Sequence, residues 1–322
     1  MKTQPVIALM NDRVSLVTAR FGLLTLMAVL FCTPFMASAH PPSGIVVDRS
    51  GNVFAAGSIG AGPQFPGFVW KIDRQGKVTS FHKGSAHYLA LETQGIFDRD
   101  KLNALFSERK TPWLGPVALS APRQSLLRAD GCPIVVHSDG NIYFAAGNLE
   151  VSRLTPDGKA TSLGRDLKAT TEKLGGIKGL ASGPDGRLYL ACPSAVLRLK
   201  PDGAVAVLVH PIALEDCEKD PQDSMAEPGL RGLAVDAQGT VFAAATGCRR
   251  VVKIRQDGTV TVVLRAEPPW APTGVAIHGA ELYVLEYSQA NSEKHEDWQP
   301  RVRKIGQDGK VDTLATLSKD WN

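Results

Sequence analysis

The sequence lacks the features that mark nucleic-acid-binding and zinc-binding proteins. Its 36 Lys and Arg nearly balance 32 Asp and Glu, and the formal net charge of +4 is spread over 322 residues without a basic run. Nucleic-acid-binding proteins gather basic residues on one face, so we expect no nucleic-acid partner. The chain has no C-x-x-C pair of the kind that holds structural zinc. It also has none of the motifs typical of P-loops, zinc proteases or EF-hands.

Long apolar runs are absent except near the N-terminal end. Three basic residues within 1–20 precede the apolar segment 21–32, FGLLTLMAVLFC, and the tripeptide A-S-A follows at 37–39. This order is typical of a secretory signal peptide. A transmembrane anchor is the alternative, but 12 residues are too few to cross about 30 Å of hydrocarbon. We therefore predict a signal peptide over 1–39, export of residues 40–322 to the periplasm or the exterior, and no membrane span.

Glycine and proline are abundant, with 31 and 21 copies. Many of the glycines belong to a repeat in which two apolar runs flank one glycine turn and two more flank a D-G or Q-G turn. Such glycines supply the positive φ that tight hairpins need. The glycines of the first turns are spaced by 44, 45, 46, 53 and 40 residues, and they are Gly51, Gly95, Gly140, Gly186, Gly239 and Gly279.

Four short strands in each of six copies predict an all-β fold, a six-bladed β-propeller of four-stranded antiparallel blades. A β-solenoid is the alternative, but its coils are shorter and lack two hairpins per unit. The second copy is degenerate, because only 87–91 matches an opening strand and 98–110 reads better as a helix. We expect one domain with blades at about 43–82, 83–131, 132–176, 177–229, 230–271 and 272–317.

The repeat units carry a family resemblance. The segment GLAVDAQGTVF at 232–242 and the P-D-G turns resemble NHL-repeat and SMP-30/gluconolactonase-like propellers, over about 43–317. The run GPDGRLY at 183–189 is similar to the repeat of streptogramin lyases. The resemblance implies the fold, and many functions share one fold.

The SMP-30 resemblance also implies an axial calcium site, which this sequence does not match. Members of that family hold the cation with Glu, Asn and Asp, partly through E-G-P and N-G-L motifs. The corresponding positions read Pro42-Ser43-Gly44, Lys178-Gly179, Arg231-Gly232 and Thr273-Gly274. Calcium prefers oxygen ligands, and two of these positions are cations. We therefore assign no metal ligands, and a calcium cofactor is implied by the family alone.

The long connections predict which end of the propeller carries function. In an antiparallel blade, the loops between the second and third strands and between blades lie at one end, which we call the mouth. The long segments 57–67, 98–112, 210–229 and 287–300 all fall there. Loops and the axial channel of a propeller are common sites of binding.

The same frame predicts the residues that line the mouth. Those just before the inner strands are Ser43, His87, Cys132, Lys178, Arg231 and Thr273, and those near the ends of the second strands are Ser58, Asn148, Cys192, Thr246, Glu286 and Tyr287. From these we select His87, Lys178, Arg231, Thr273, Glu286 and Tyr287 as the binding residues. Such a cationic ring suits a small polar or anionic molecule. The alternative is that Arg231 and Glu286 pair with each other and only join two blades.

The cysteines are interpreted through the predicted export. The four that follow residue 39 favour disulfides in an oxidising compartment. Cys217 and Cys248 fall in neighbouring loops at the mouth, and we prefer this pair. Cys132 and Cys192 form a second bond or remain thiols.

Three classes of function follow from the sequence. The first is an exported binding protein for a small polar or anionic ligand. The second is a hydrolase or lyase, lactonase-like or streptogramin-lyase-like, in which His87 or Glu286 acts as acid or base, because imidazole titrates near neutral pH. The third is a protein-interaction platform, as NHL propellers often are.

Overall fold

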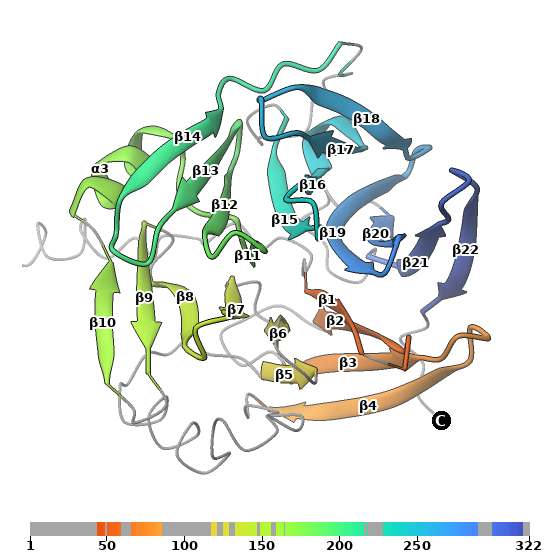
Figure 1. Cartoon of the computed structure of the whole chain (residues 1–322). Helices are drawn as coiled ribbons and strands as arrows, with labels where there is room; N and C mark the ends of the chain where they lie inside the picture. Colours follow the sequence, from red (N-terminus) through yellow and green to blue (C-terminus); the bar gives the residue numbers. More distant parts are fainter. Residues whose placement is uncertain are drawn as a thin grey trace, which may run out of the picture. The chain divides into compact units, whose positions relative to one another are not determined.

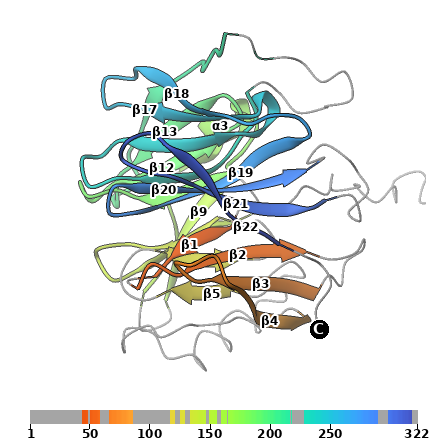
Figure 2. The same cartoon turned by 90° about the vertical axis from the view of Figure 1, so that its right-hand side faces the viewer.

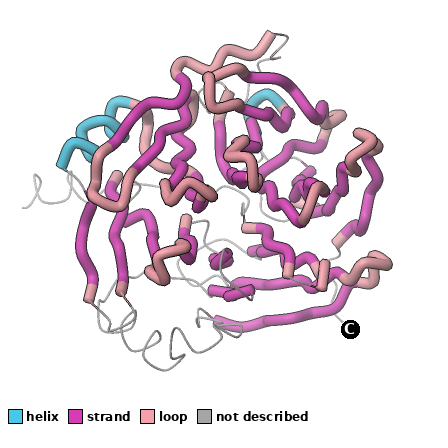
Figure 3. Tube along the Cα trace, viewed as in Figure 1, coloured by secondary structure: helices cyan, strands magenta, loops and turns pink. Residues whose placement is uncertain are grey.

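The protein is described by a computed structural model that divides into two units, 1–39 and 40–322. The residues described are 44–48, 50–58, 66–85, 117–120, 125–128, 133–146, 149–155, 159–163, 165–215, 217, 228–288 and 298–317. All of them lie in the second unit, and most of them form strands (Figure 3). No helix in this described part is long and apolar enough to span a membrane.

Five sheets have four antiparallel strands each, arranged in chain order (Figure 1). The first two are β1–β4 (Ile45–Val47, Val53–Ser58, Pro66–Ile72, Val78–Ser85) and β7–β10 (Ile134–Val136, Ile142–Ala146, Glu150–Leu154, Ala160–Leu163). The next two are β11–β14 (Gly179–Ser182, Leu188–Cys192, Ala195–Leu199, Val205–Val209) and β15–β18 (Leu230–Val235, Val241–Ala245, Arg250–Ile254, Val260–Arg265). The last is β19–β22 (Trp270–His278, Glu281–Ser288, Pro300–Ile305, Val311–Thr316). These sheets confirm a propeller of four-stranded antiparallel blades.

The number of blades differs from the prediction. The prediction of six four-stranded blades is wrong, because the described residues form five together with a two-stranded sheet, β5 (Val117–Ser120) and β6 (Ser125–Arg128). Successive inner strands contact one another around a ring, in the order β1, β6, β7, β11, β15 and β19. The strand β6 thus takes the inner place between β1 and β7.

Among the described residues this place holds two strands, and its sequence is poorer in glycine turns than the other copies. Each other copy has two glycine turns, whereas Gly115 is the only glycine within 96–129. Tight hairpins favour a glycine with positive φ, so the sequence of this copy does not repeat the two-hairpin pattern. The expected inner strand 87–91 and the expected helix 98–110 lie outside the described residues.

The D-G turns at the end opposite the mouth are built by their aspartates. The Asp185 carboxylate accepts hydrogen bonds from the Arg187 amide (3.1 Å) and the Tyr189 hydroxyl (3.0 Å). Asp139 makes the same pair of bonds with the Asn141 amide (2.9 Å) and the Tyr143 hydroxyl (2.6 Å). The D-G-x-x-Y pattern that resembles streptogramin lyases is therefore a structural motif of the blade.

A second repeated feature joins the middle strands of each blade. An aromatic residue on the second strand pairs with a cationic residue on the third in all five four-stranded sheets. The pairs are Phe54–Lys71, Tyr143–Arg153, Tyr189–Arg198, Phe242–Lys253 and Tyr283–Lys304. In three of them the ammonium lies 5.9 Å from the ring centroid. Each such cross-strand pair contributes about 0.2–1 kcal/mol.

One helix, α3 (Arg165–Lys173), was not predicted. It lies between β10 and β11, in a connection at the mouth end, and its Leu167 is fully buried among residues of the two flanking blades. The Thr171 hydroxyl donates to the Leu149 carbonyl at 2.6 Å, which fixes the helix to the preceding blade. An acidic first turn at Asp166 and the pair Gly175-Gly176 after the last turn are the sequence signals for such a helix.

The ring closes between the first and last blades without a shared strand among the described residues. The sheet β19–β22 comes entirely from the C-terminal part of the chain and lies beside β1–β4 (Figure 2). Side chains of both sheets, including Trp70 and Trp298, form one buried cluster. Across this boundary the Tyr287 hydroxyl donates to the Ala56 carbonyl at 2.9 Å.

Candidate functional site

The starts of the inner strands β11 and β15 bring Lys178 and Arg231 to equivalent positions of neighbouring blades. In β15 the register shifts between Leu230 and Leu233, so the chain bulges at Arg231. Just before β11, the Lys178 amide donates to the Ala191 carbonyl (2.7 Å), and Ala191 is also the register partner of Gly179. Two residues thus face one, which is the arrangement of a bulge. Bulges of this kind re-aim side chains and are common beside binding sites.

Gly179 allows these two strands to approach each other closely. A Cβ atom at this position would lie 2.2 Å from the Arg231 carbonyl oxygen and 2.5 Å from the Leu233 side chain. Only glycine fits at such distances, since real Cβ contacts are longer. The glycine that follows Lys178 thus sets the two cationic residues next to each other.

The charges of Lys178 and Arg231 act on each other in a partly dry environment. Lys178 is half-buried and Arg231 is 7% exposed. Burial, and secondly the charge of Arg231, lower the pKa of Lys178. The neighbouring Cys192 thiol is neutral, because burial raises its pKa to about 12. Among the described residues, no acidic side chain pairs with the Lys178 ammonium.

Thr273 occupies the equivalent position of the next blade, also in a bulge. The register of β19 shifts between Pro272 and Gly274, which leaves Thr273 without a directly opposite residue. Its side chain is fully buried, and its hydroxyl lies 3.5 Å from the Leu285 carbonyl. The structure therefore places Thr273 beside the two cations in the ring but behind the surface of the mouth.

Glu286 and Tyr287, both expected at the mouth, point to opposite faces of the last blade because they are adjacent in β20. Tyr287 faces the first blade and is 2% exposed. Glu286 faces the other way and is fully buried. Its carboxylate binds Arg301 Nε at 2.6 Å and lies 3.8 Å from Arg303. The partner within hydrogen-bond distance is thus Arg301 rather than Arg231, the partner considered from the sequence.

Arg301 is a residue that the sequence analysis missed. It is the second residue of β21 (Pro300–Ile305), the third strand of its blade, at the mouth end, and its guanidinium stacks on the Trp270 ring at 4.0 Å. Burial raises the pKa of Glu286 even though Arg301 and Arg303 oppose this effect. The third strand of a blade begins at the mouth end, where the second strand finishes. The predicted strand order could therefore have identified Arg301 as a residue of the mouth.

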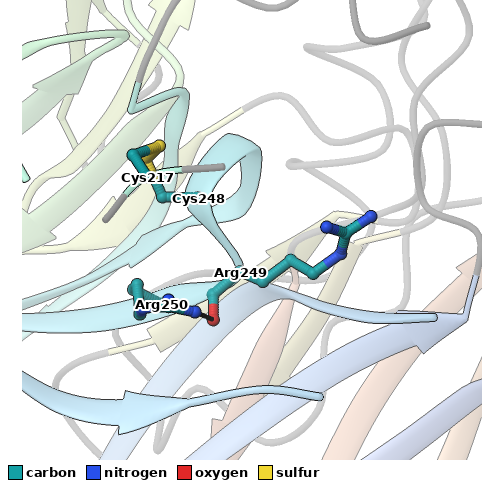
Figure 4. The surroundings of a disulfide bond; sticks show 4 residues. All are labelled: Cys217, Cys248, Arg249 and Arg250. Atoms are coloured by element: carbon teal, nitrogen blue, oxygen red, sulfur yellow. Dashed lines mark hydrogen bonds between the residues drawn. A yellow bond between two sulfur atoms is a disulfide. The ribbon is translucent and has the colours of Figure 1, made fainter. Parts of the chain in front are cut away.

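Arg249 is a second missed residue, in the loop that the disulfide anchors. Cys217 is bonded to Cys248, the pair preferred from the sequence, and the two Cα atoms are 4.9 Å apart. Cys248 ends the short helix η1 (Thr246–Cys248), and Arg249 follows it with φ 51° and ψ 42°. Figure 4 shows the Arg249 side chain running away from the disulfide. A non-glycine residue in this left-handed conformation is uncommon and is often found at functional sites.

The remaining residues expected at the mouth are partly outside the described chain. Thr246 and Cys192 are fully buried, and Cys192 is a free thiol, which rules out a bond from it to Cys132. The residues that are not described are Ser43, His87, Cys132 and Asn148, together with the side chain of Ser58. No group of three or more His, Cys, Asp or Glu within the described residues is arranged to hold a metal ion.

Comparison with known proteins shows similarity at the level of folded structures. No family model and no curated protein matches the sequence. Virginiamycin B lyase from Staphylococcus aureus is similar over 88% of this chain and 87% of its own, with 14% identity and a TM-score of 0.49. A streptogramin B lyase is similar over 88% and 86%, with 12% identity and a TM-score of 0.49. A putative gluconolactonase is similar over 86% and 77%, with 13% identity and a TM-score of 0.40.

Two of these neighbours are lyases and the third is a putative gluconolactonase. No sequence match assigns the chain to the NHL-repeat or SMP-30 family in particular. Similarity this low says nothing about what the chain binds, so function must come from the residues of the site.

Proposed function

We propose that this protein is an exported propeller that binds a small anionic molecule at its mouth. The observation that carries the proposal is the half-buried Lys178 ammonium beside Arg231, with no acidic partner among the described residues. The positive charges of Lys178 and Arg231 repel each other in a partly desolvated environment. A bound anion would offset both this repulsion and the lost hydration of the ammonium. The bulges and Gly179 hold the two cations in this arrangement.

Two further cationic residues lie at the same end of the molecule, which supports this end as the binding site. Arg249 follows the loop closed by the disulfide, and Arg301 is the second residue of β21. Both positions lie at the end where the inner strands begin. The signal-like segment 1–39 and the Cys217–Cys248 bond support export.

The catalytic alternative is supported less well by the described residues. Of its two acid–base candidates, Glu286 is buried in an ion pair, and His87 lies outside the described residues. The function that the geometry supports best is therefore binding.

The proposal is tested by calorimetric titration of the purified protein with citrate, inorganic phosphate and glucose. We expect the two anions to bind and the neutral sugar not to bind. Lys178→Met should weaken anion binding by about tenfold or more, since a charge-assisted contact is lost. The matched control is Lys200→Met, which removes an exposed lysine from a turn at the opposite end. Absence of anion binding, or equal binding by both variants, would overturn the proposal.

A further inference from the structure

Arg301 is held in one orientation by two different side chains. Its guanidinium stacks on the Trp270 ring at 4.0 Å, and its Nε donates to Glu286 Oε2 at 2.6 Å. The three residues come from different strands, β19, β20 and β21, so the side chain crosses the sheet face from the third strand to the inner one. A guanidinium fixed by both its plane and one edge cannot rotate freely.

This arrangement leaves the terminal edge of the guanidinium for another partner. Within the described residues, the hydrogen bond of Arg301 goes through Nε alone. The side chain is 16% exposed, and Trp270 is half-buried. The two terminal nitrogens of arginine form a planar fork that matches two oxygens of a carboxylate or of a phosphate.

Stability alone does not explain this arrangement. Glu286 is fully buried, and within the described part of the chain its Oε1 atom has no hydrogen-bond partner. Arg303 Nε is also buried without a partner among the described residues. Removing such groups from water is costly, and a buried ion pair is often no more stabilising than apolar side chains of the same size. The stability of the fold does not explain why the Glu286 carboxylate is buried. Holding Arg301 in one orientation does explain it.

We propose that Arg301 recognises an oxyanion group of the bound ligand, a carboxylate or a phosphate, through its two terminal nitrogens, and that Trp270 and Glu286 are positioning residues. This inference rests on the proposed function and deepens it, because it adds a residue of fixed geometry from another blade to the binding site. Lys178 supplies a point charge, whereas Arg301 supplies a planar fork for two oxygens of one group.

The experiment compares binding of benzoate, benzamide and inorganic phosphate by calorimetry. The wild-type protein should bind benzoate and phosphate and should not bind neutral benzamide. Arg301→Lys keeps the positive charge beside Glu286 but removes the planar fork. It should weaken the binding of benzoate and of phosphate about tenfold each. The control is Arg198→Lys, a third-strand arginine that also pairs with an aromatic residue, Tyr189, in another blade.

A second variant, Trp270→Leu, tests the role of Arg301 even if Arg301→Lys does not fold. Trp270→Leu leaves the Arg301–Glu286 ion pair in place but removes the stacking that fixes the plane of the guanidinium. It should weaken the binding of both anions about threefold, because the guanidinium is no longer held in one plane, while the melting temperature shows that the protein remains folded.

The outcomes separate this inference from the proposed function. If the wild-type protein binds both anions and Arg301→Lys and Trp270→Leu bind them as tightly, the role of Arg301 is overturned and anion binding stands. If the wild-type protein binds neither anion, both proposals are overturned. Weaker binding of both anions by the two variants, with Arg198→Lys unchanged, supports the inference.

Discussion

At the scale of single residues, Lys178 shows how a low net charge conceals local electrostatics. The whole chain carries a formal charge of +4, and its charges are well mixed along the sequence. The fold nevertheless sets Lys178 beside Arg231, and its other ionisable neighbour, the Cys192 thiol, is neutral because burial raises its pKa to about 12. The ammonium therefore loses its proton more easily than a lysine in water does.

The first prediction concerns the pH dependence of anion binding. Because the pKa of Lys178 is lowered from its usual 10.5, the ammonium is lost, and anion affinity falls, as pH rises through a range below 10.5. Over the same range the unliganded protein gains stability, since the unfolded chain holds this proton more tightly than the folded protein does. Calorimetric titrations with citrate at a series of pH values between 7 and 10 measure the first effect.

The control for this prediction is Lys178→Arg. Arginine stays protonated over the whole range. Cys192 stays neutral, because its pKa is raised to about 12. The variant should therefore lose the pH dependence while it keeps affinity at neutral pH. An identical profile in both proteins would show that another group titrates.

At the scale of structural elements, the sequence predicted the strands well and the distortions of the strands poorly. The strand order and the D-G turns follow from apolar alternation and glycine spacing, which are local properties. The bulges at Arg231 and Thr273 do not follow from these, since they depend on the packing of one inner strand against the next. The pairing of Glu286 with Arg301 likewise required the register between β20 and β21.

The degenerate copy was misjudged for a related reason. One matching strand and one turn at 87–95 were extended to a full blade, although 96–129 contains a single glycine. Where the repeat was strong, the predicted residues lie at the starts of inner strands, as for Lys178 and Arg231, and their role in binding stays a prediction. Among the described residues, Arg249 and Arg301 were missed because each follows a loop whose path the repeat does not specify.

The second prediction concerns Gly179, which lies between the bulges of neighbouring blades. Gly179→Ala places a Cβ atom 2.2 Å from the Arg231 carbonyl, so β11 and β15 must move apart. We expect a loss of about 2–3 kcal/mol in the free energy of unfolding, as is typical of overpacking. Anion binding should also weaken, because Lys178 and Arg231 are displaced. Urea unfolding and citrate titration measure the two effects.

The matched control is Gly279→Ala, in a turn at the opposite end. A Cβ atom there meets nothing within 4 Å, and the cost is limited to the positive φ of 61°. This variant should lose about 1 kcal/mol and keep its anion affinity. Equal effects of the two substitutions on binding would mean that the close approach at Gly179 does not shape the site.

At the scale of the whole molecule, the way in which the ring closes distinguishes this chain from a propeller with a shared last blade. All four strands of β19–β22 come from one stretch of chain, so no backbone ladder joins the first and last blades in the described part. The boundary is held by a buried cluster that contains Trp70 and Trp298, and by the bond from Tyr287 to Ala56. Side-chain packing is therefore what keeps the ring closed at this boundary.

The third prediction is that Tyr287→Phe weakens this boundary selectively. The substitution removes the hydroxyl that donates to the Ala56 carbonyl at 2.9 Å, at a side chain that is 2% exposed. Leaving a buried carbonyl without its donor costs about 1–3 kcal/mol. Hydrogen exchange should become faster in β1, β2, β19 and β20, while β11–β14 keeps its protection. Urea unfolding gives the total loss, and exchange followed by mass spectrometry locates it.

The control is Tyr283→Phe in the same strand. The Tyr283 hydroxyl donates to Glu281 at 2.8 Å within a single blade, and the Glu281 side chain is 36% exposed and also paired with Lys304. Water replaces that bond, so stability should fall by less than about 1 kcal/mol without a change at the first blade. If Tyr283→Phe opened β1 and β2 as much as Tyr287→Phe does, closure would depend on the packing of β20 in general rather than on this bond. Among the described residues, no strand is shared between the first and last blades. A selective effect of Tyr287→Phe would therefore show that one buried hydroxyl contributes measurably to closing the ring.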